Sequence, residues 1–188
     1  MQQHLNRAAP LANWRILDVG CGGGEVLADF MHWDALPRNL YGVGLLCESV
    51  ETAKHRFPGL HFQQGNAEHL PFPAAFFDLV AQFTVFTSIL DDRMARNIAG
   101  EIRRVLKPGG AVLWYDLRFN NPWNAHVRGI TRPQIGALFP GFSADLRSIT
   151  LLPLLARRLG RATQMFYPIL SKISAFRTHY IGLLLKPR

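Results

Sequence analysis

The sequence predicts an α/β protein built on a doubly wound parallel sheet. Short apolar runs alternate with helical patterns along most of the chain, which is typical of strands joined by crossover helices. A glycine-rich turn at 20–24 follows the first apolar run and leads directly into a helical pattern. Such a turn lies at the carboxyl edge of a parallel sheet, where α/β folds bind their ligands.

The expected elements follow from apolar runs, helical spacing and breakers. Strands buried on both faces read as continuous apolar runs, and we expect strands at 15–19, 40–46, 60–64, 76–83, 111–115, 144–152 and 178–185. Helical spacing predicts helices at 25–33, 48–57, 91–106, 133–138 and 153–174. The clearest helix is 91–106, which Asp91 or Asp92 can cap. The Lys-Pro-Gly-Gly segment at 107–110 is expected to end it.

Length and composition predict one globular domain over residues 1–188. The hydrophobic content is 48% and the charged content 18%, which suits a packed chain rather than a disordered one. No apolar run reaches the length of a membrane span, and 1–11 lacks the apolar core of a signal peptide. The only cysteines are Cys21 and Cys47, so we expect no disulfide framework, no metal site and a cytoplasmic location.

The charge of the chain is uneven. The net charge is +8, and most of the basic excess follows Arg93. This favours anionic partners, although a solvated basic surface explains it equally well. The segment 151–176 is both basic and apolar, so it can contact a membrane surface, wall an apolar pocket, or pack as a helix on the sheet. The sequence leaves open whether the protein is a monomer or a homodimer.

The glycine-rich turn has a specific spacing. Glycine stands at Gly20, Gly22 and Gly24, after Asp18 at the end of the first apolar run. The dinucleotide fingerprint would need a glycine where Glu25 stands, and the Gly-Lys-Ser/Thr of a P-loop is absent. The pattern Asp-x-Gly-x-Gly-x-Gly resembles the first motif of the class I S-adenosylmethionine (SAM)-dependent methyltransferases. The alternative is a glycine-rich turn that binds no ligand.

Two later segments follow the order of the same family. They are 70–73 (Leu-Pro-Phe-Pro) with 77–80 (Phe-Asp-Leu-Val), and 103–110 (Arg-Arg-Val-Leu-Lys-Pro-Gly-Gly). The resemblance covers about 15–117. It implies a Rossmann-like methyltransferase fold whose last strand is antiparallel to the others, and SAM as the cofactor.

The resemblance also implies which residues line the cofactor. Gly20 and Gly22 would leave room for the methionine part of SAM, while Asp18 would orient the turn or reach the ammonium group of the ligand. The full implied set is Asp18, Gly20, Cys21, Gly22, Gly44, Leu45, Asn66, Ala67, Glu68, Gln82 and Phe83.

Two positions depart from the family pattern. Gly44 stands where the family carries an acidic residue that binds both ribose hydroxyls, and Asn66 stands where it often carries an aspartate that accepts from adenine. Glu48 can substitute for the missing acid, or it can simply favour the dipole at a helix start. Losing a charge-assisted pair costs on the order of 1.5–3 kcal/mol, roughly ten- to hundredfold in affinity.

Catalysis by this family needs little from side chains, because the sulfonium is already an activated methyl donor. A hydroxyl acceptor would also need a base, for which Tyr115, Asp116 and His126 are candidates. Their alternative roles are core packing, loop capping and plain surface exposure, respectively. The loop 120–124 is the segment we expect to face the acceptor.

The substrate class is narrowed by absent motifs. The end of the fourth strand, 82–86, lacks the Pro-Pro-aromatic motif of enzymes that methylate base amino groups, and no Pro-Cys pair or RNA-binding module is recognisable. We therefore expect a SAM-dependent methyltransferase acting on a small-molecule, saccharide or lipid-linked acceptor, with nucleic acid disfavoured. The alternatives are a non-catalytic relative with weakened SAM affinity and a nucleic-acid methyltransferase.

Overall fold

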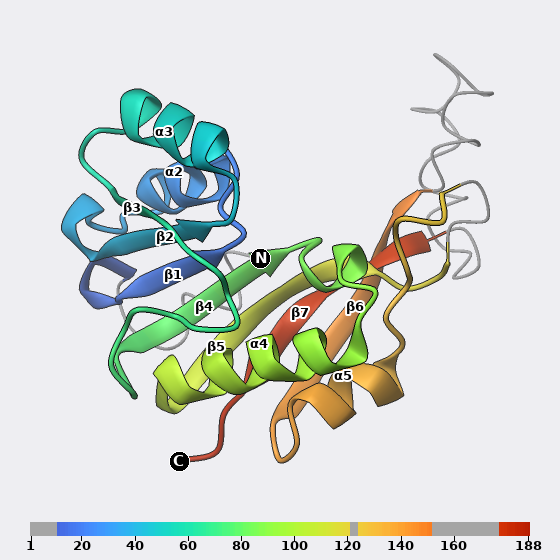
Figure 1. The fold of residues 1–188 in the computed structure, drawn as a ribbon. Helices are drawn as coiled ribbons and strands as arrows, with labels where there is room; N and C mark the ends of the chain where they lie inside the picture. The colour runs from blue at the N-terminus through green and yellow to red at the C-terminus, as the bar shows by residue number, and fades with distance from the viewer. Residues whose placement is uncertain (1–10, 121–123, 152–176) are drawn as a thin grey trace, which may run out of the picture.

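The computed structural model describes residues 11–120, 124–151 and 177–188, which form a seven-stranded sheet in the order β3-β2-β1-β4-β5-β7-β6 (Figure 1). The strands are β1 (Ile16–Val19), β2 (Leu40–Gly44), β3 (His61–Gln64), β4 (Phe77–Phe83), β5 (Leu106–Leu117), β6 (Ser143–Leu151) and β7 (Arg177–Leu185). β1 to β5 are parallel, and β7 runs antiparallel to both of its neighbours. The doubly wound sheet with an antiparallel last strand is thus confirmed.

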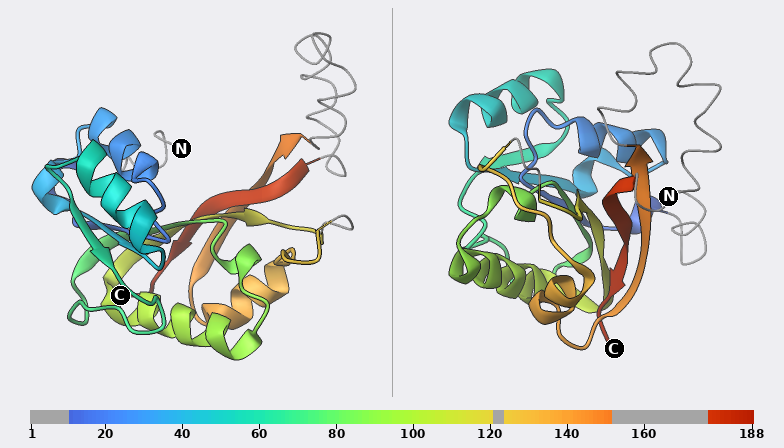
Figure 2. Two further views of the ribbon diagram at one scale, coloured as in Figure 1. Left: turned by 45° about the horizontal axis from the view of Figure 1, so that its top comes forward. Right: turned by 90° about the vertical axis from the view of Figure 1, so that its right-hand side faces the viewer.

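Helices cover both faces of this sheet (Figures 1 and 2). Helices α2 (Glu25–His32) and α3 (Cys47–Arg56) pack on one face, and α4 (Asp92–Val105) and α5 (Arg132–Leu138) pack on the other. Short 3-10 turns complete the described elements: η1 (Leu11–Asn13), η2 (Pro37–Asn39) and η3 (Phe86–Ser88). Asp91 caps α4 through a hydrogen bond accepted from the backbone N–H of Met94, as expected.

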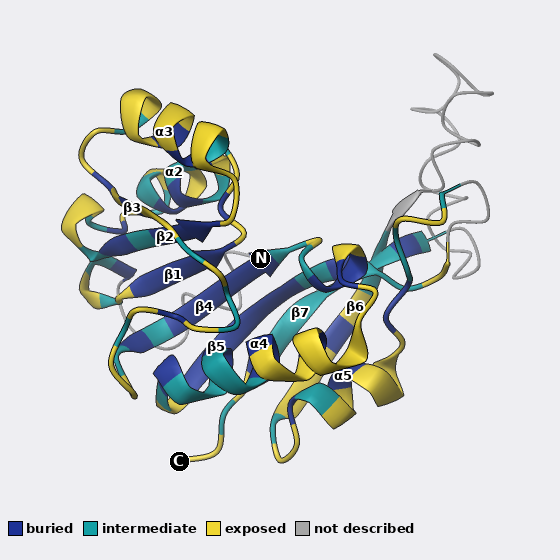
Figure 3. Ribbon diagram, viewed as in Figure 1, coloured by how far each residue is buried: buried dark blue, intermediate teal, exposed yellow. Residues whose placement is uncertain are grey.

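The core lies in two layers on either side of the central strands (Figure 3). On the α4/α5 side, Trp114 stacks on Phe86 with ring centroids 5.0 Å apart. On the α2/α3 side, Ile16 and Phe30 are fully buried. All four residues of β1 are buried, which is why this strand reads as a continuous apolar run interrupted only by Asp18.

Some predicted boundaries were wrong, and the backbone shows why. β5 begins at Leu106 rather than at 111, because Phe77 pairs with Leu106 before a register shift brings Leu79 opposite Ala111. The segment 107–110 is therefore a bulge at the start of β5 rather than a free turn. β2 ends at Gly44, which leaves Leu45 and Leu46 69% and 67% exposed.

Several predictions fall outside the described residues. They are the helix at 153–174, most of the membrane-contacting segment 151–176, and the middle of the loop 120–124. Among the described helices, none has the length and apolar character needed to cross a bilayer. No three His, Cys, Asp or Glu side chains of the described residues come together in a metal-binding group.

Candidate active site

The predicted cofactor-binding segments meet at the carboxyl edge of the sheet. β1 and β4 are neighbours in the sheet, and the strand order reverses between them, so the glycine turn after β1 lies at a topological switch point. Backbone hydrogen bonds join the segments that follow β1 and β3 to the end of β2, which lies between these strands. Gly20 N–H donates to Val43 O at 2.8 Å, and Gly65 N–H donates to Gly44 O at 3.0 Å.

Two of the three glycines in the turn allow close packing, and the third leaves open space. Gly20, Gly22 and Gly24 all have positive φ, at 76°, 49° and 88°. A Cβ atom on Gly20 would lie 2.7 Å from Val85 Cγ2, and one on Gly24 would lie 2.7 Å from Phe62 Cζ, so neighbouring side chains fill both places. A Cβ atom on Gly22 would meet nothing within 4 Å. The outer side of the turn is therefore an open cradle centred on Gly22.

Asp18 lies directly before this turn and is 1% exposed. Its Oδ2 atom is buried and has no hydrogen-bond partner among the described residues. Burial, followed by repulsion from the Glu25 carboxylate, raises the pKa of Asp18 to about 8. A cationic group placed beside this oxygen would satisfy it and restore its charge. The site therefore fits a ligand that brings an ammonium group to the glycine turn.

The end of β2 explains the unusual Gly44. A Cβ atom on Gly44 would lie 3.0 Å from Val50 Cγ2 and 3.3 Å from Cys21 Sγ. Burial and the Asp18 carboxylate raise the pKa of the Cys21 thiol to about 12, so this side chain acts as a neutral packing group. Val50 and Cys21 would thus crowd the Cβ atom of an acidic side chain at this position. Glu48 lies in the first turn of α3, where a carboxylate favours the helix dipole.

Polar side chains of the loop after β3 form hydrogen bonds with other groups of the protein. Asn66 Oδ1 accepts a hydrogen bond of 2.9 Å from the backbone N–H of Glu68, and Glu68 Oε1 accepts one of 2.8 Å from Asn97 Nδ2. Ala67 is half-buried between them. One lone pair of the amide oxygen predicted to face adenine is therefore engaged within the loop, while Asn66 itself is exposed.

An aromatic wall borders the ends of β4 and β5. Phe83 stacks on Tyr115 with ring centroids 5.4 Å apart, and Tyr115 stacks on His179 at 4.7 Å with the ring planes 7° apart. We call Phe83, Tyr115 and His179 the aromatic stack. Gln82, which precedes Phe83, is fully buried, and Thr84, which follows Phe83, has a φ of 59°, which is strained for a β-branched residue.

The three candidate bases have different surroundings. Asp116 is fully buried and accepts hydrogen bonds of 3.1 Å from the backbone N–H groups of Phe86 and Thr87, so it anchors η3. Burial raises the pKa of Asp116 to about 7 even though these bonds lower it. Tyr115 lies within the aromatic stack, whereas His126 is exposed on the segment after β5.

His179 is a site residue that the sequence did not reveal. No motif surrounds it, and only the pairing of β7 with β5 brings Leu117 opposite His179. Burial lowers the pKa of His179, so its ring is neutral at pH 7. Its Nδ1 atom lies 2.9 Å from Thr178 Oγ1.

A parallel sheet with an open glycine cradle at its switch point defines a Rossmann-like nucleotide-binding domain. Residues 17–114 match the family described as methyltransferase domain, and the chain belongs to this family. Membership indicates SAM as the cofactor, and the unpartnered Asp18 oxygen beside the Gly22 cradle fits its methionine end.

Individual proteins resemble parts or all of the chain. It is 37% identical over 128 residues to a phthiotriol/phenolphthiotriol dimycocerosates methyltransferase of Mycobacterium ulcerans, a match that covers 63% of this chain and 44% of the relative. It is 37% identical over 106 residues to a fatty-acid O-methyltransferase of Mycolicibacterium smegmatis, covering 55% and 37%. The chain thus spans less than half the length of these relatives.

The fold has close counterparts among solved structures. A SAM-dependent methyltransferase from Methanosarcina mazei superimposes with a TM-score of 0.69 at 18% sequence identity, covering 98% of this chain and 97% of the other. At this identity the likeness establishes the fold alone. The antiparallel β7 and the strand order are therefore shared features of a known architecture.

Proposed function

We propose that this protein is a SAM-dependent methyltransferase that acts on a lipid-linked or other small apolar acceptor. The observation that carries the proposal is the unpartnered, buried oxygen of Asp18 beside the open cradle at Gly22. The named activities of the mycobacterial relatives support the acceptor class, because those enzymes act on dimycocerosate lipids and on fatty acids.

The proposal gives each segment of the site a task. Asp18 holds the ammonium group of the cofactor, the backbone at Gly20 to Gly22 passes beneath its methionine part, and Asn66 to Glu68 borders its adenine. When bound, SAM supplies an activated methyl group, so the remaining work of the chain is to bind and orient the acceptor. The aromatic stack forms the wall beside which the acceptor lies, with Tyr115 as the nearest candidate base.

Calorimetric titration with S-adenosylhomocysteine tests the cofactor site. We expect saturable binding, weakened roughly ten- to hundredfold by Asp18→Asn, because the neutral amide keeps the shape of the carboxylate but not its charge. Asp29→Asn on the exposed side of α2 is the matched control and should bind like the unmodified protein. The absence of heat at millimolar ligand would refute the proposal.

A non-catalytic binding protein is the second candidate, and two observations favour it. At the end of β2 a side chain on residue 44 would crowd Val50 and Cys21, and Asn66 Oδ1 already accepts a hydrogen bond within its loop. Transfer of a radiolabelled methyl group to a long-chain fatty acid separates the two candidates. Cofactor binding without transfer to any lipid acceptor would support the second.

The net charge of +8 keeps a nucleic-acid substrate open as a further alternative. Binding of RNA or DNA that weakens steeply with salt, together with methyl transfer to the nucleic acid, would identify that activity. A shallow salt dependence and no transfer would leave the lipid acceptor as the proposal.

A further inference from the structure

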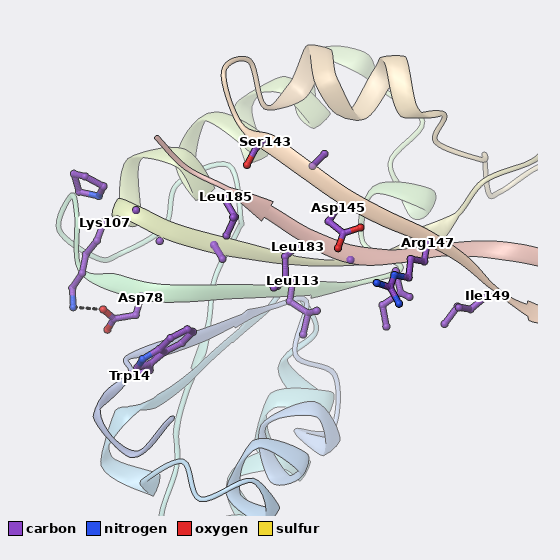
Figure 4. A pocket seen from close by; sticks show the side chains of 17 residues that line it. Trp14, Asp78, Lys107, Leu113, Ser143, Asp145, Arg147, Ile149, Leu183 and Leu185 are labelled. Atoms are coloured by element: carbon purple, nitrogen blue, oxygen red, sulfur yellow. Dashed lines mark hydrogen bonds and ion pairs between the residues drawn. The ribbon is translucent and has the colours of Figure 1, made fainter. Parts of the chain in front are cut away.

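The α2/α3 face of the sheet is only partly covered. Helices α2 and α3 lie over β1 and β2, whereas no described helix lies over β5, β7 and β6 on this side (Figure 2). A cavity of about 830 Å³ occupies the uncovered region. We call it the trough; Figure 4 shows it between Trp14 and β6. Its apolar floor is formed by Ala111, Leu113, Ile149, Ile181 and Leu183.

The trough lies on the same side of the sheet as the aromatic stack. Paired residues in a sheet point to the same face, and Leu113 pairs with Leu183 while Tyr115 pairs with Ile181. Tyr115, a member of the aromatic stack, therefore stands on the trough side of the sheet. On β7 the floor extends from Leu185 to Ile181, about 13 Å at the rise of a β-strand, and Ile181 pairs with Tyr115. An extended hydrocarbon segment of this length fits along the floor with one end beside the stack.

Charged groups lie only at the borders of the trough. The ion pair between Lys107 and Asp78, with 2.7 Å between Nζ and Oδ1, closes the end away from the active site. Asp145 and Arg147 lie along β6 on the outer border (Figure 4). Arg147 pairs with Ile181, so it shares a row of the sheet with Tyr115. It forms no ion pair with any described residue.

We propose that the trough binds the acyl chain of a long-chain carboxylic acid acceptor. The chain lies over Ile181 and Leu183, and its carboxylate is held between Arg147 and the aromatic stack. The trough and a fatty acid complement each other in two ways. The apolar floor matches the acyl chain, and the cation of Arg147, unpaired among the described residues and in the same row of the sheet as Tyr115, matches the carboxylate. This inference rests on the proposed methyltransferase function and adds the part of the sheet that selects the substrate.

The test measures binding of a fluorescent polyene fatty acid to the full chain, so it does not depend on methyl transfer. Ile181→Asp places a charge on the floor and should weaken fatty-acid binding tenfold or more. Arg147→Gln should weaken binding of the fatty acid severalfold but leave the corresponding fatty alcohol unaffected. Met94→Asp changes an exposed apolar residue of α4, on the opposite face, and is the matched control.

S-adenosylhomocysteine binding is measured on every variant to separate the two proposals. If the unmodified protein binds this ligand but no fatty acid, or if Ile181→Asp binds the fatty acid as tightly as Met94→Asp, the trough proposal is overturned while the methyltransferase proposal stands. Loss of thermal cooperativity in Ile181→Asp would make the milder Ile181→Ser the deciding variant, with a smaller decrease expected.

Two other occupants of the trough would also overturn the proposal. A dimer in the unmodified protein that dissociates in Ile181→Asp would show that a second copy of the chain covers this face. Fatty-acid binding that begins only after residues 1–10 are removed would show that the chain covers the trough with its own residues.

Discussion

At the scale of single residues, the buried carboxyl group of Asp18 makes the stability of the folded protein depend on pH. Its pKa is raised from 3.8 to about 8 in the folded protein, so between these values the folded state holds a proton that the unfolded state has released. Stability therefore falls as the pH rises through this window. The raised pKa follows mainly from burial, which an ammonium ligand would offset.

Asp18→Asn removes this dependence. We expect the variant to gain stability over the unmodified protein as the pH rises from 5 to 8, by up to about 1.4 kcal/mol per pH unit. Urea denaturation at several pH values measures the difference. Equal pH dependence of the two proteins would show that the Asp18 carboxyl group titrates normally.

Gly44 is the residue whose replacement tests the missing ribose contact. Gly44→Asp alone brings a Cβ atom to 3.0 Å from Val50 Cγ2, so we expect lower stability. Combining it with Val50→Ala removes that contact and allows the carboxylate to bind the ribose. S-adenosylhomocysteine should then bind roughly tenfold more tightly than to Val50→Ala alone. Unchanged affinity would place the ribose elsewhere.

At the scale of elements, the hydrogen bonds of Asp116 fix the short helix η3 beside the site. Its carboxylate accepts from two backbone N–H groups of η3 and from the Thr87 hydroxyl. The same hydroxyl accepts from the backbone N–H of Leu117 at 3.2 Å. The end of β5 and the turn after β4 are thereby held as one unit, and Val85 within that turn contacts Gly20.

Thr87→Val keeps the shape of this side chain and removes the hydroxyl. We expect a loss of about 1–3 kcal/mol in the free energy of unfolding, because the buried carboxylate of Asp116 loses a partner. Ser88→Ala is the matched control, since Ser88 is exposed and its hydroxyl donates to Thr84 O at 3.1 Å. Equal effects of the two substitutions in urea denaturation would contradict a structural role for the buried network.

The uniformly buried strands and the glycine turn could be predicted from the sequence, because both depend on a local pattern of residues. The sequence failed at the start of β5, where a register shift with β4 decides the boundary. It also missed His179, which reaches Tyr115 only through the pairing of β7 with β5. The reason for Gly44 was equally hidden, because Val50 belongs to a helix whose packing on β2 is tertiary.

At the scale of the whole molecule, burial is concentrated in the central strands. Every residue of β1 is buried, whereas three of the four residues of the edge strand β3 are exposed. We expect amide hydrogen exchange to be slowest in β1 and β4 and fastest in β3, because edge strands open locally. Uniform protection across the sheet, measured by mass spectrometry, would show instead that it opens only as a whole.

The position of β7 has a consequence for synthesis of the protein. β7 lies between β5 and β6 in space but follows both in the chain. Until the ribosome has polymerised residue 185, β5 has a bare edge and β6 has no described neighbour. The nascent chain therefore carries apolar, unpaired strand edges until β7 has been synthesised, and such edges are prone to aggregation.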